Sequence, residues 1–286
     1  MKNINVGIVG LGLIGASFAK GFKAKEPSVK VYAANRTKTV LDKALAEKAI
    51  DGILDEGTIP CCDLIILGLY PELCVKFLEK NKDLISKSCI VTDVCGTKAY
   101  ICEEGFRIAA EKGFTFIGGH PMAGTQFSGY DYARADMFEG SSMILVPGKE
   151  DDPGSGRLKE MLAPLGFGMF AVTDAAEHDR IIAYTSQMAH VLANAYIKSP
   201  TLKSSTGFTG GSFRDMTRVA YLNPGMWTEL FMANRENLID EIGYAIDNLS
   251  KVRDALRDSD PDMLYKLLED GSRRKEESLN EQDNNG

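Results

Sequence analysis

Short apolar runs alternate with amphipathic stretches along roughly the first 170 residues of the chain. The runs are rich in β-branched residues, which is typical of strands buried on both faces of a parallel sheet. We expect strands at 6–9, 29–35, 63–70, 89–94, 115–119, 141–146 and 168–172. Because helical patterns separate most of these runs, the alternation predicts an α/β fold. We expect a Rossmann-type, doubly wound and mostly parallel sheet, with ligands at the carboxyl ends of its strands.

From residue 174 onward the strand pattern stops and helical periodicity replaces it. We expect helices at 174–197, 210–220, 224–256 and 261–268. The long helix carries more apolar surface than a compact half-domain buries, which favours a homodimer formed through this region. The predicted organisation is a dinucleotide-binding domain at 1–172, an all-helical substrate and dimerisation domain at 173–270, and a charged, disordered tail at 271–286.

The first predicted strand leads into a glycine turn with the spacing G-x-G-x-x-G, formed by Gly10, Gly12 and Gly15. The first glycine permits a sharp turn, the second lets a pyrophosphate approach the backbone, and the third lets the following helix pack on the strand. Leu13 and Ile14 lie between them at the start of the helix. The turn therefore predicts a dinucleotide at a helix N-terminus.

The end of the second predicted strand bears on the choice of dinucleotide. A fold that binds NAD usually carries an acid there for the ribose 2′-hydroxyl, whereas this chain has Asn35, Arg36 and Thr37. The arginine can pair with a 2′-phosphate, so we expect NADP, with NAD as the second choice. The other interpretation is a surface arginine beside a helix N-cap. Leu69 and Asp93, at the ends of later strands, complete the expected cofactor contacts.

Composition narrows the class of partner. The formal net charge is −7 and the isoelectric point is about 5.2, so no basic field favours nucleic acid or an anionic membrane. All six cysteines lie within 61–102 without a C-x-x-C pair, so we expect reduced thiols and no metal. No apolar run is long enough to span a bilayer and no signal segment precedes the first strand, so we expect a cytoplasmic enzyme with a small-molecule substrate.

The chain has three histidines, and each is a candidate for proton transfer. His120 follows a predicted strand in the cofactor domain, where ligands are expected. His178, Ser186 and His190 lie in the first helix of the helical region and span an arc of roughly 120° on an ideal helix. They can therefore face one cleft. The alternative is that His178 forms a local contact with Asp179 and that His190 is an ordinary core histidine.

A second polar cluster follows in the helical region. Arg214 and Arg218 are one helical turn apart, and the pair Gly210 and Gly211 precedes them. The single tryptophan, Trp227, comes shortly afterwards. An arginine, small residues and a large ring together favour a pocket for a planar substrate that carries a carboxylate.

Four segments, in this order across about residues 4–250, resemble the prephenate dehydrogenase family, which includes arogenate dehydrogenases. They are GLGLIGAS, GGHPMAGTQFSG, EHD with TSQMAH, and GGSFRDMTRVA with MW. The resemblance implies oxidative decarboxylation of a cyclohexadienol, prephenate or arogenate, in tyrosine biosynthesis. In that reaction hydride leaves the carbon that bears the hydroxyl, CO2 leaves, and the ring becomes aromatic.

The resemblance also implies roles for individual residues. A neutral imidazole that accepts the hydroxyl proton lowers the barrier, and His120 matches the family position for this role. Arg218 matches the arginine that holds a substrate carboxylate. The other matched positions line the pocket or lie near the substrate side chain: Gly211, Trp227, His178 and His190.

Two positions depart from the family pattern. Gly96 stands where the family usually has a serine that binds the substrate hydroxyl, so either Thr97, Cys95 or a water replaces that hydrogen bond or activity is weaker. Gln187 stands in place of a histidine within the family's SHLPH segment. Prephenate and arogenate therefore both remain open as substrates.

Other functions are compatible with the same two-domain organisation. One is a β-hydroxyacid dehydrogenase, although no lysine occurs in 174–197 for its chemistry, or a pyrroline-5-carboxylate reductase, suggested by residues 35–37. Another is a dinucleotide sensor without catalysis, suggested by Gly96 and Gln187. The dehydrogenase hypothesis requires that His120 and Arg218 meet across one cleft, with the nicotinamide between them.

Overall fold

The computed structural model describes residues 4–125, 127–149 and 152–285, with side chains as far as residue 280. The chain divides into two compact units, residues 1–234 and residues 235–286. The first unit contains the sheet and the helices that directly follow it, and the second is a pair of long helices.

An eight-stranded sheet forms the centre of the first unit, in the order β3-β2-β1-β4-β5-β6-β7-β8. Every pairing is parallel except β6 with β7. The strands are β1 (Asn5–Val9), β2 (Lys30–Ala34), β3 (Gly52–Ile53), β4 (Leu64–Leu67), β5 (Ile90–Asp93), β6 (Thr115–Pro121), β7 (Ser142–Pro147) and β8 (Met169–Val172). The predicted Rossmann-type sheet is confirmed. The two-residue strand β3 was not predicted, because so short a pairing has no periodicity.

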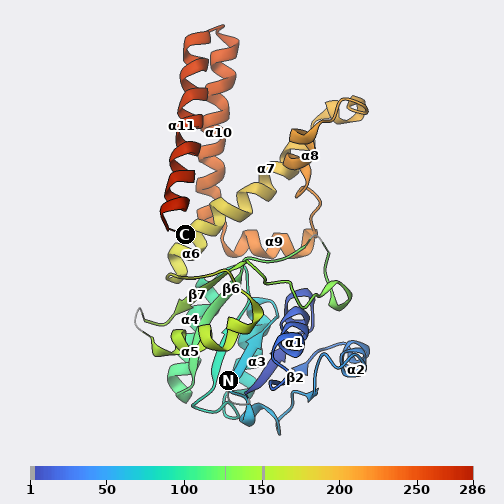
Figure 1. Cartoon of the computed structure of the whole chain (residues 1–286). Coiled ribbons are helices and arrows are strands. Elements are labelled where there is room, and N and C mark those ends of the chain that lie inside the picture. Colours follow the sequence, from blue (N-terminus) through green and yellow to red (C-terminus); the bar gives the residue numbers. More distant parts are fainter. Residues whose placement is uncertain (1–3, 126, 150–151, 286) are drawn as a thin grey trace. The chain divides into compact units, whose positions relative to one another are not determined.

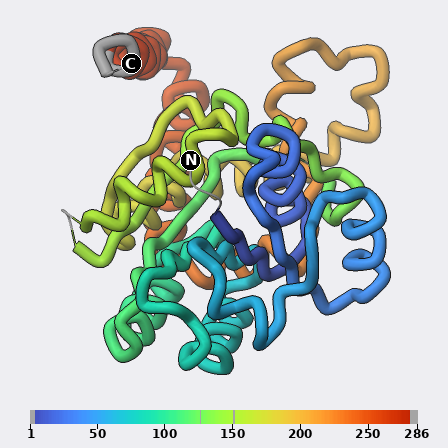
Figure 2. Tube along the Cα trace, turned by 60° about the horizontal axis from the view of Figure 1, so that its bottom comes forward, coloured from blue at the N-terminus to red at the C-terminus, as the bar shows by residue number. Residues whose placement is uncertain are grey.

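Helices cover both faces of this sheet (Figures 1 and 2). Side chains of successive strand residues point to opposite faces, so Leu64 and Ile66 of β4 enter one core cluster while Ile65 and Leu67 enter the other. The first cluster is covered by α1 (Leu13–Lys25), α2 (Lys38–Ala46) and α5 (Pro153–Leu162), and the second by α3 (Pro71–Asn81) and α4 (Ala99–Lys112). Burial on both faces explains why the strands are apolar throughout.

Four helices and a π-helical turn follow the sheet within the same unit. They are α6 (Ala175–Ile182), the π turn Ala183–Gln187, α7 (Met188–Tyr196), α8 (Gly211–Thr217) and α9 (Pro224–Ala233). The single helix expected at 174–197 is thus interrupted by a π turn. The boundary predicted at 172/173 coincides with the end of the sheet, whereas the compact units divide at 234/235.

The prediction of one long helix at 224–256 is wrong, because the structure has two helices there, separated at Asn234. This residue has φ −121° and ψ 28°, outside helical values. Its side chain is buried and donates to the carbonyl of Asp179 at 2.8 Å and to Oε1 of Gln187 at 3.0 Å. Asparagine leaves helical geometry readily when its side chain bonds elsewhere, and these bonds come from residues distant in sequence.

The second unit consists of α10 (Arg235–Arg257) and α11 (Pro261–Asn285). The two helices lie side by side (Figure 1), and Asp260 caps α11 by accepting a hydrogen bond from the N–H of Met263 at 2.9 Å. The disorder expected for 271–286 is not what the structure shows for 271–285, which is helical. Pairs one turn apart, such as Arg274 with Asp270 and Arg273 with Glu277, favour the helix.

Within the described ranges, no helix combines the length and the apolar character needed to cross a membrane.

Candidate active site

The three glycines of the turn after β1 have different surroundings. Gly10 has φ +95°, and a Cβ there would stand 2.5 Å from the carbonyl oxygen of Gly68. A Cβ at Gly15 would stand 2.0 Å from the carbonyl oxygen of Gly10. In contrast, a Cβ at Gly12 would meet nothing within 4 Å. The protein itself therefore requires Gly10 and Gly15, whereas Gly12 faces open space.

This open space fits a dinucleotide phosphate. Gly12 is the N-cap of α1, no side chain caps the helix, and its first turn holds no acidic residue. Its free N–H groups and the positive end of the helix dipole therefore face the space that Gly12 leaves. The residues present therefore fit a dinucleotide cofactor.

Asn35 fastens the end of β2 to the glycine turn. Its Oδ1 accepts from the N–H of Leu11 at 3.1 Å and its Nδ2 donates to the carbonyl of Thr37 at 3.1 Å. Thr37 is the N-cap of α2 but its side chain makes no capping bond. Arg36 is exposed and forms no ion pair with any residue in the described part of the chain. Its guanidinium is available to a ligand bound at this edge.

The other expected cofactor residues lie nearby, with one exception. Leu13 and Ile14 of α1 are half-buried against the first core cluster, and Leu69 is half-buried at the end of β4. Asp93 has no exposed surface. The expected contact of Asp93 with the cofactor therefore finds no exposed surface here and stays a prediction. Its carboxylate pairs with Lys98 and accepts the N–H groups of residues 95 and 119.

The end of β6 and the start of α6 bring two histidines and a carboxylate into one chain of contacts. Nδ1 of His120 lies 2.9 Å from Nε2 of His178, and Nδ1 of His178 lies 2.7 Å from Oδ1 of Asp179. Asp179 also accepts from the N–H of Lys98 at 2.7 Å and of Ala99 at 2.9 Å. This carboxylate thus caps α4 while it holds His178.

These contacts determine which nitrogen of each ring carries the proton. Asp179 accepts from two backbone N–H groups, so we assign it as a carboxylate, and Nδ1 of His178 must then donate to it. In the tautomer with its proton on Nδ1, His178 presents a bare Nε2, which accepts the proton of Nδ1 of His120. The remaining nitrogen of His120, Nε2, is left with a free lone pair. The contact of His178 with Asp179, considered above as an alternative to a functional role, is thus part of this arrangement.

The surroundings of His120 favour its neutral form. Burial, the positive charge of Lys98 and the ring of His178 together lower the pKa of His120 well below its usual value of 6.5. A neutral imidazole with a free lone pair is suited to accept a proton near neutral pH.

The loop between β5 and α4 reaches the same place. Gly96 is half-buried, and a Cβ there would stand 3.2 Å from the side chain of Leu230 in α9. Thr97 is buried, and its hydroxyl makes no hydrogen bond to another described residue. Thr97 directly precedes Lys98, whose N–H donates to Asp179, and its replacement of the family serine stays a prediction.

The π turn changes the arrangement expected for the helical histidines. The predicted arc assumed an ideal α-helix, but residues 183–187 turn more slowly, so that arc does not apply. Ser186 is half-buried. Gln187 is buried, with Nε2 3.4 Å from the carbonyl of Leu230 and Oε1 accepting from Asn234. The side chain of Gln187 is thus bonded internally, and its contact with substrate stays a prediction.

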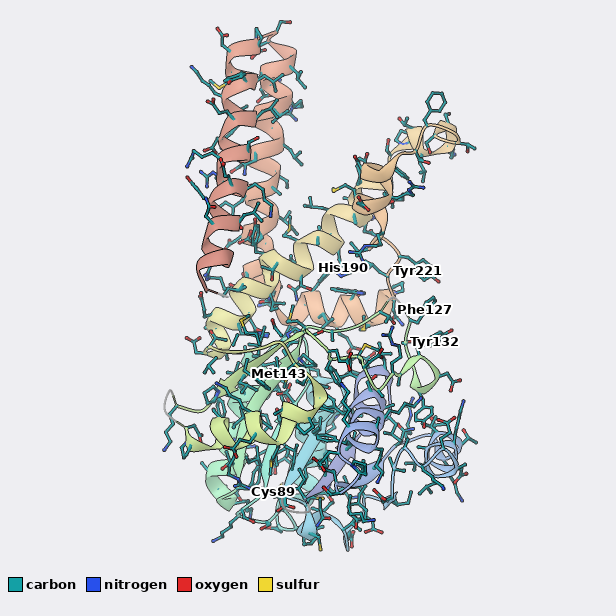
Figure 3. The ribbon with its side chains drawn as sticks, in the orientation of Figure 1. Cys89, Phe127, Tyr132, Met143, His190 and Tyr221 are labelled. Carbon is teal, nitrogen blue, oxygen red and sulfur yellow. The ribbon has the colours of Figure 1, made fainter. Side chains whose placement is uncertain are left out.

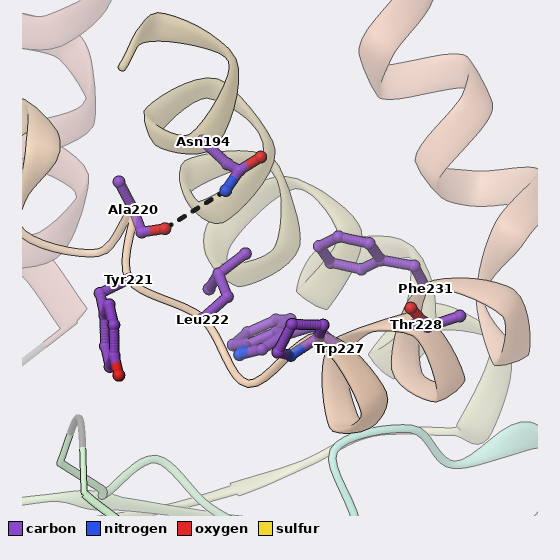
Figure 4. A pocket seen from close by; sticks show the side chains of 8 residues that line it. Asn194, Ala220, Tyr221, Leu222, Trp227, Thr228 and Phe231 are labelled. Carbon is purple, nitrogen blue, oxygen red and sulfur yellow. Dashed lines mark hydrogen bonds between the residues drawn. The ribbon is translucent and has the colours of Figure 1, made fainter. Parts of the chain in front are cut away.

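His190 lies beside a pocket in the helical part of this unit. Its Nδ1 donates to the carbonyl of Val219 at 3.0 Å, and its ring centroid lies 3.9 Å from that of Trp227. The pocket has a volume of about 410 Å³ and is lined by Trp227, Phe231, Tyr221 and Asn194 among others (Figure 4). Figure 3 shows His190 and Tyr221 together, apart from Met143 in the sheet.

The arginine cluster lies near this pocket. Gly211, Arg214 and Arg218 are exposed, and neither arginine forms an ion pair within the described ranges. Burial and the charge of Arg218 lower the pKa of His190, while its bond to Val219 acts against this. The structure thus brings Arg218, His190 and the pocket together. The expected meeting of Arg218 with His120 around one ring stays a prediction.

Three residues of this site were not among the candidates: Lys98, Asp179 as a partner of α4, and Asn234. In the EHD segment Asp179 directly follows His178, and this neighbouring pair could have indicated that the carboxylate is a partner of the imidazole. Nothing in the spacing of the sequence indicated that Lys98 is fully buried, because lysine is seldom buried.

Comparisons with known proteins agree with this geometry. Residues 18–167 match the family model of the prephenate dehydrogenase nucleotide-binding domain, and residues 174–270 match that of the prephenate dehydrogenase dimerization domain. A prephenate dehydrogenase of Bacillus subtilis is 28% identical over 273 residues, which is 91% of this chain and 72% of that protein.

Two solved structures share the fold over almost their whole length. One is an arogenate dehydrogenase from Synechocystis, with 28% identity, a TM-score of 0.80, and coverage of 95% of this chain and 99% of that one. The other is a prephenate dehydrogenase from A. aeolicus in complex with hydroxyphenyl propionate and NAD+, with 26% identity, a TM-score of 0.84, and coverage of 97% and 99%. With its dinucleotide turn and its histidine pair on β6 and α6, the chain belongs to the prephenate dehydrogenase family and is an NAD(P)-dependent oxidoreductase.

Proposed function

We propose that the protein catalyses NADP-dependent oxidative decarboxylation of prephenate to 4-hydroxyphenylpyruvate, with arogenate as the alternative substrate. The observation that carries this proposal is the chain His120, His178 and Asp179, which leaves Nε2 of a neutral His120 free to accept a proton. Relatives with this fold act, by their names, on one or the other of these cyclohexadienols.

His120 performs the proton transfer in this proposal. When the ring hydroxyl of the substrate becomes a carbonyl, its O–H bond breaks and the proton passes to Nε2 of His120. When bound at the glycine turn, NADP would accept the hydride that leaves the same carbon. The bond between the ring and its carboxylate then breaks, CO2 departs, and the electron pair of that bond completes the aromatic ring and leaves a negative charge on the former carbonyl oxygen. That oxygen takes the proton back from Nε2 of His120 and becomes the hydroxyl of the product. General-base groups of this kind contribute about 10²–10⁴-fold to the rate.

We assign substrate recognition to the second group of residues. Arg218 has no ion pair among the described residues and provides a fork for a substrate carboxylate. His190 and Trp227 border the neighbouring pocket, whose aromatic lining suits a planar ring. Gly211, Arg214, Ser186 and Thr97 remain proposed contacts on the grounds given by the sequence.

NADP rather than NAD is our proposal for the cofactor. No acid stands at the end of β2, and Arg36 is exposed with no ion pair in the described part of the chain. A 2′-phosphate would supply that partner. We also propose that two copies of the chain form a homodimer through the helical region, since residues 174–270 match a dimerization domain.

Steady-state kinetics with both substrates and both cofactors test the function. We expect the highest kcat/KM with prephenate and NADP. The variant His120→Asn should lose about 10²–10⁴-fold in kcat while it still binds NADP in calorimetry. Faster turnover of arogenate would select the alternative substrate. Cofactor binding without turnover of either compound would contradict the proposal and favour a dinucleotide sensor.

A further inference from the structure

Lys98, the residue before α4, is fully buried although it carries a charge. Its ammonium group pairs with the carboxylate of Asp93, which is also fully buried. Burial penalises a charged lysine, but the attraction of Asp93 and other neighbours more than offsets this, so the pKa of Lys98 is raised. Lys98 therefore stays positively charged inside the protein, where a lone charge is costly.

One connection from Lys98 to the catalytic histidine runs through its side chain. Asp93, which holds the ammonium group, also accepts a hydrogen bond from the N–H of Gly119 at 3.1 Å. Gly119 directly precedes His120 on β6. The same carboxylate accepts from the N–H of Cys95 at 2.8 Å. The Asp93 carboxylate of this ion pair therefore links the end of β6 to the loop after β5 by hydrogen bonds.

A second connection runs through the backbone of Lys98. Its N–H donates to Oδ1 of Asp179 at 2.7 Å, and that same oxygen accepts from Nδ1 of His178. His178 in turn contacts Nδ1 of His120 at 2.9 Å. Through its side chain, Lys98 is thus linked by Asp93 to Gly119, the residue before His120. Through its backbone, it is linked by Asp179 to His178, which contacts the ring of His120.

Asp93 balances the charge of Lys98 within the ion pair, but it is the ammonium group that acts on the pKa of His120. The groups that face His120 or Lys98 are Asp93 on β5, Cys95 in the loop, Cys102 on α4, and His178 and Asp179 on α6. Burial raises the pKa of the Cys102 thiol to about 12, and the Cys74 thiol together with burial raises that of Cys95 well above its usual value. Both thiols are therefore uncharged at neutral pH. Burial, the charge of Lys98 and the ring of His178 act on the pKa of His120, and all three lower it.

We propose that Lys98 is a positioning residue for His120, which fixes the imidazole through Asp93 and Asp179 and uses its buried positive charge to keep the ring in its neutral, proton-accepting form. The catalytic part of this inference rests on the proposed function, in which His120 accepts the hydroxyl proton. The charge effect itself is a property of the folded chain and can be measured without turnover.

The direct test is a pH titration of the histidine rings by NMR on 15N-histidine-labelled full-length protein. The chain has only three histidines, and the spectrum of His120→Asn identifies the signals of His120. We expect His120 in the variant Lys98→Met to take up its proton at higher pH than in the unchanged protein. The double variant Lys98→Met with Asp93→Asn, which leaves no unpaired buried charge, should shift in the same direction, and Lys98→Arg should not shift.

The second readout is the pH profile of kcat/KM. Activity requires neutral His120, so its acidic limb should move to higher pH in Lys98→Met. If the limb moves by one unit, kcat/KM below it falls roughly tenfold relative to its plateau value. Lys82→Met is the matched control, because Lys82 pairs with Glu79 and Glu111 at the surface, and it should leave both readouts unchanged.

Two results would overturn the proposal. One is an unchanged titration of His120 in both the single and the double variant. The other is a loss of kcat that is equal at every pH, which indicates a purely structural role for Lys98. If the unchanged protein turns over neither substrate, the proposed function fails, while the NMR titration still decides the role of Lys98.

Discussion

Asp179 shows how one side chain can serve two elements at the scale of single residues. Its carboxylate accepts two N–H groups at the start of α4 and also the Nδ1 proton of His178. Negative charge at a helix N-terminus is favoured by the helix dipole. The interaction that stabilises α4 therefore also selects the tautomer of His178 and, through it, that of His120.

A glycine pair in the dinucleotide turn offers a test at this scale. Gly12→Ala should leave the fold intact, because a Cβ meets nothing within 4 Å, but it should weaken NADP binding at least about tenfold by blocking the approach of the pyrophosphate. Gly10→Ala should instead lower the melting temperature, because of its positive φ and the clash with Gly68. Calorimetry and thermal unfolding give the two readouts. An unchanged Kd in Gly12→Ala would contradict the placement of the cofactor.

The π turn at 183–187 is the informative feature at the scale of elements. It lies between the helix that carries His178 and the helix that carries His190. A π turn changes the rotation of the following residues about the helix axis and is often found at functional sites. Here it turns Gln187 inward, where it bonds with Asn234 at the break between α9 and α10.

The role of Gln187 can be tested by stability rather than by substrate binding. Gln187→Ala removes a buried acceptor for Asn234, so we expect the free energy of unfolding to fall by about 1–3 kcal/mol in urea. KM for the substrate should change little, since the side chain is buried. Ser186→Ala is the control, because Ser186 makes no side-chain hydrogen bond with the described residues, and it should cost less. A large rise in KM with unchanged stability would instead support the substrate-binding role of Gln187.

Exposed apolar side chains on α10 bear on the whole molecule. Ile239, Ile246, Leu249 and Leu256 are all more than half exposed. Their spacing of seven, three and seven residues places them on one face of the helix. A contiguous apolar face of this kind usually marks an interaction surface. Together with the match to a dimerization domain, it supports the proposed homodimer.

Light scattering coupled to size-exclusion chromatography tests this assembly. We expect the unchanged chain to be a dimer and the double variant Ile246→Lys with Leu249→Lys to be a monomer, because buried lysines lack partners in such an interface. Asp247→Lys introduces the same residue beside this face and should leave the dimer intact. A monomeric unchanged protein would refute the dimer, and a dimeric double variant would place the interface elsewhere.

The sequence by itself determined the sheet, the dinucleotide turn and the candidate proton acceptor. Buried parallel strands must be apolar along their whole length, and the turn at 10–15 needs glycine for local steric reasons. These properties depend on neighbouring residues, so periodicity and spacing are enough to predict them. The position of His120 after a strand followed from the same rules.

Only the tertiary structure decided which polar residues form the site and which support it. Asp93 and Gln187 had the appearance of ligand contacts, but both are buried and bonded internally. Lys98 and Asn234 had no distinguishing pattern, yet each joins segments that lie far apart in the sequence. A polar side chain loses water only when the folded chain supplies its partners, and those partners are set by packing between distant elements.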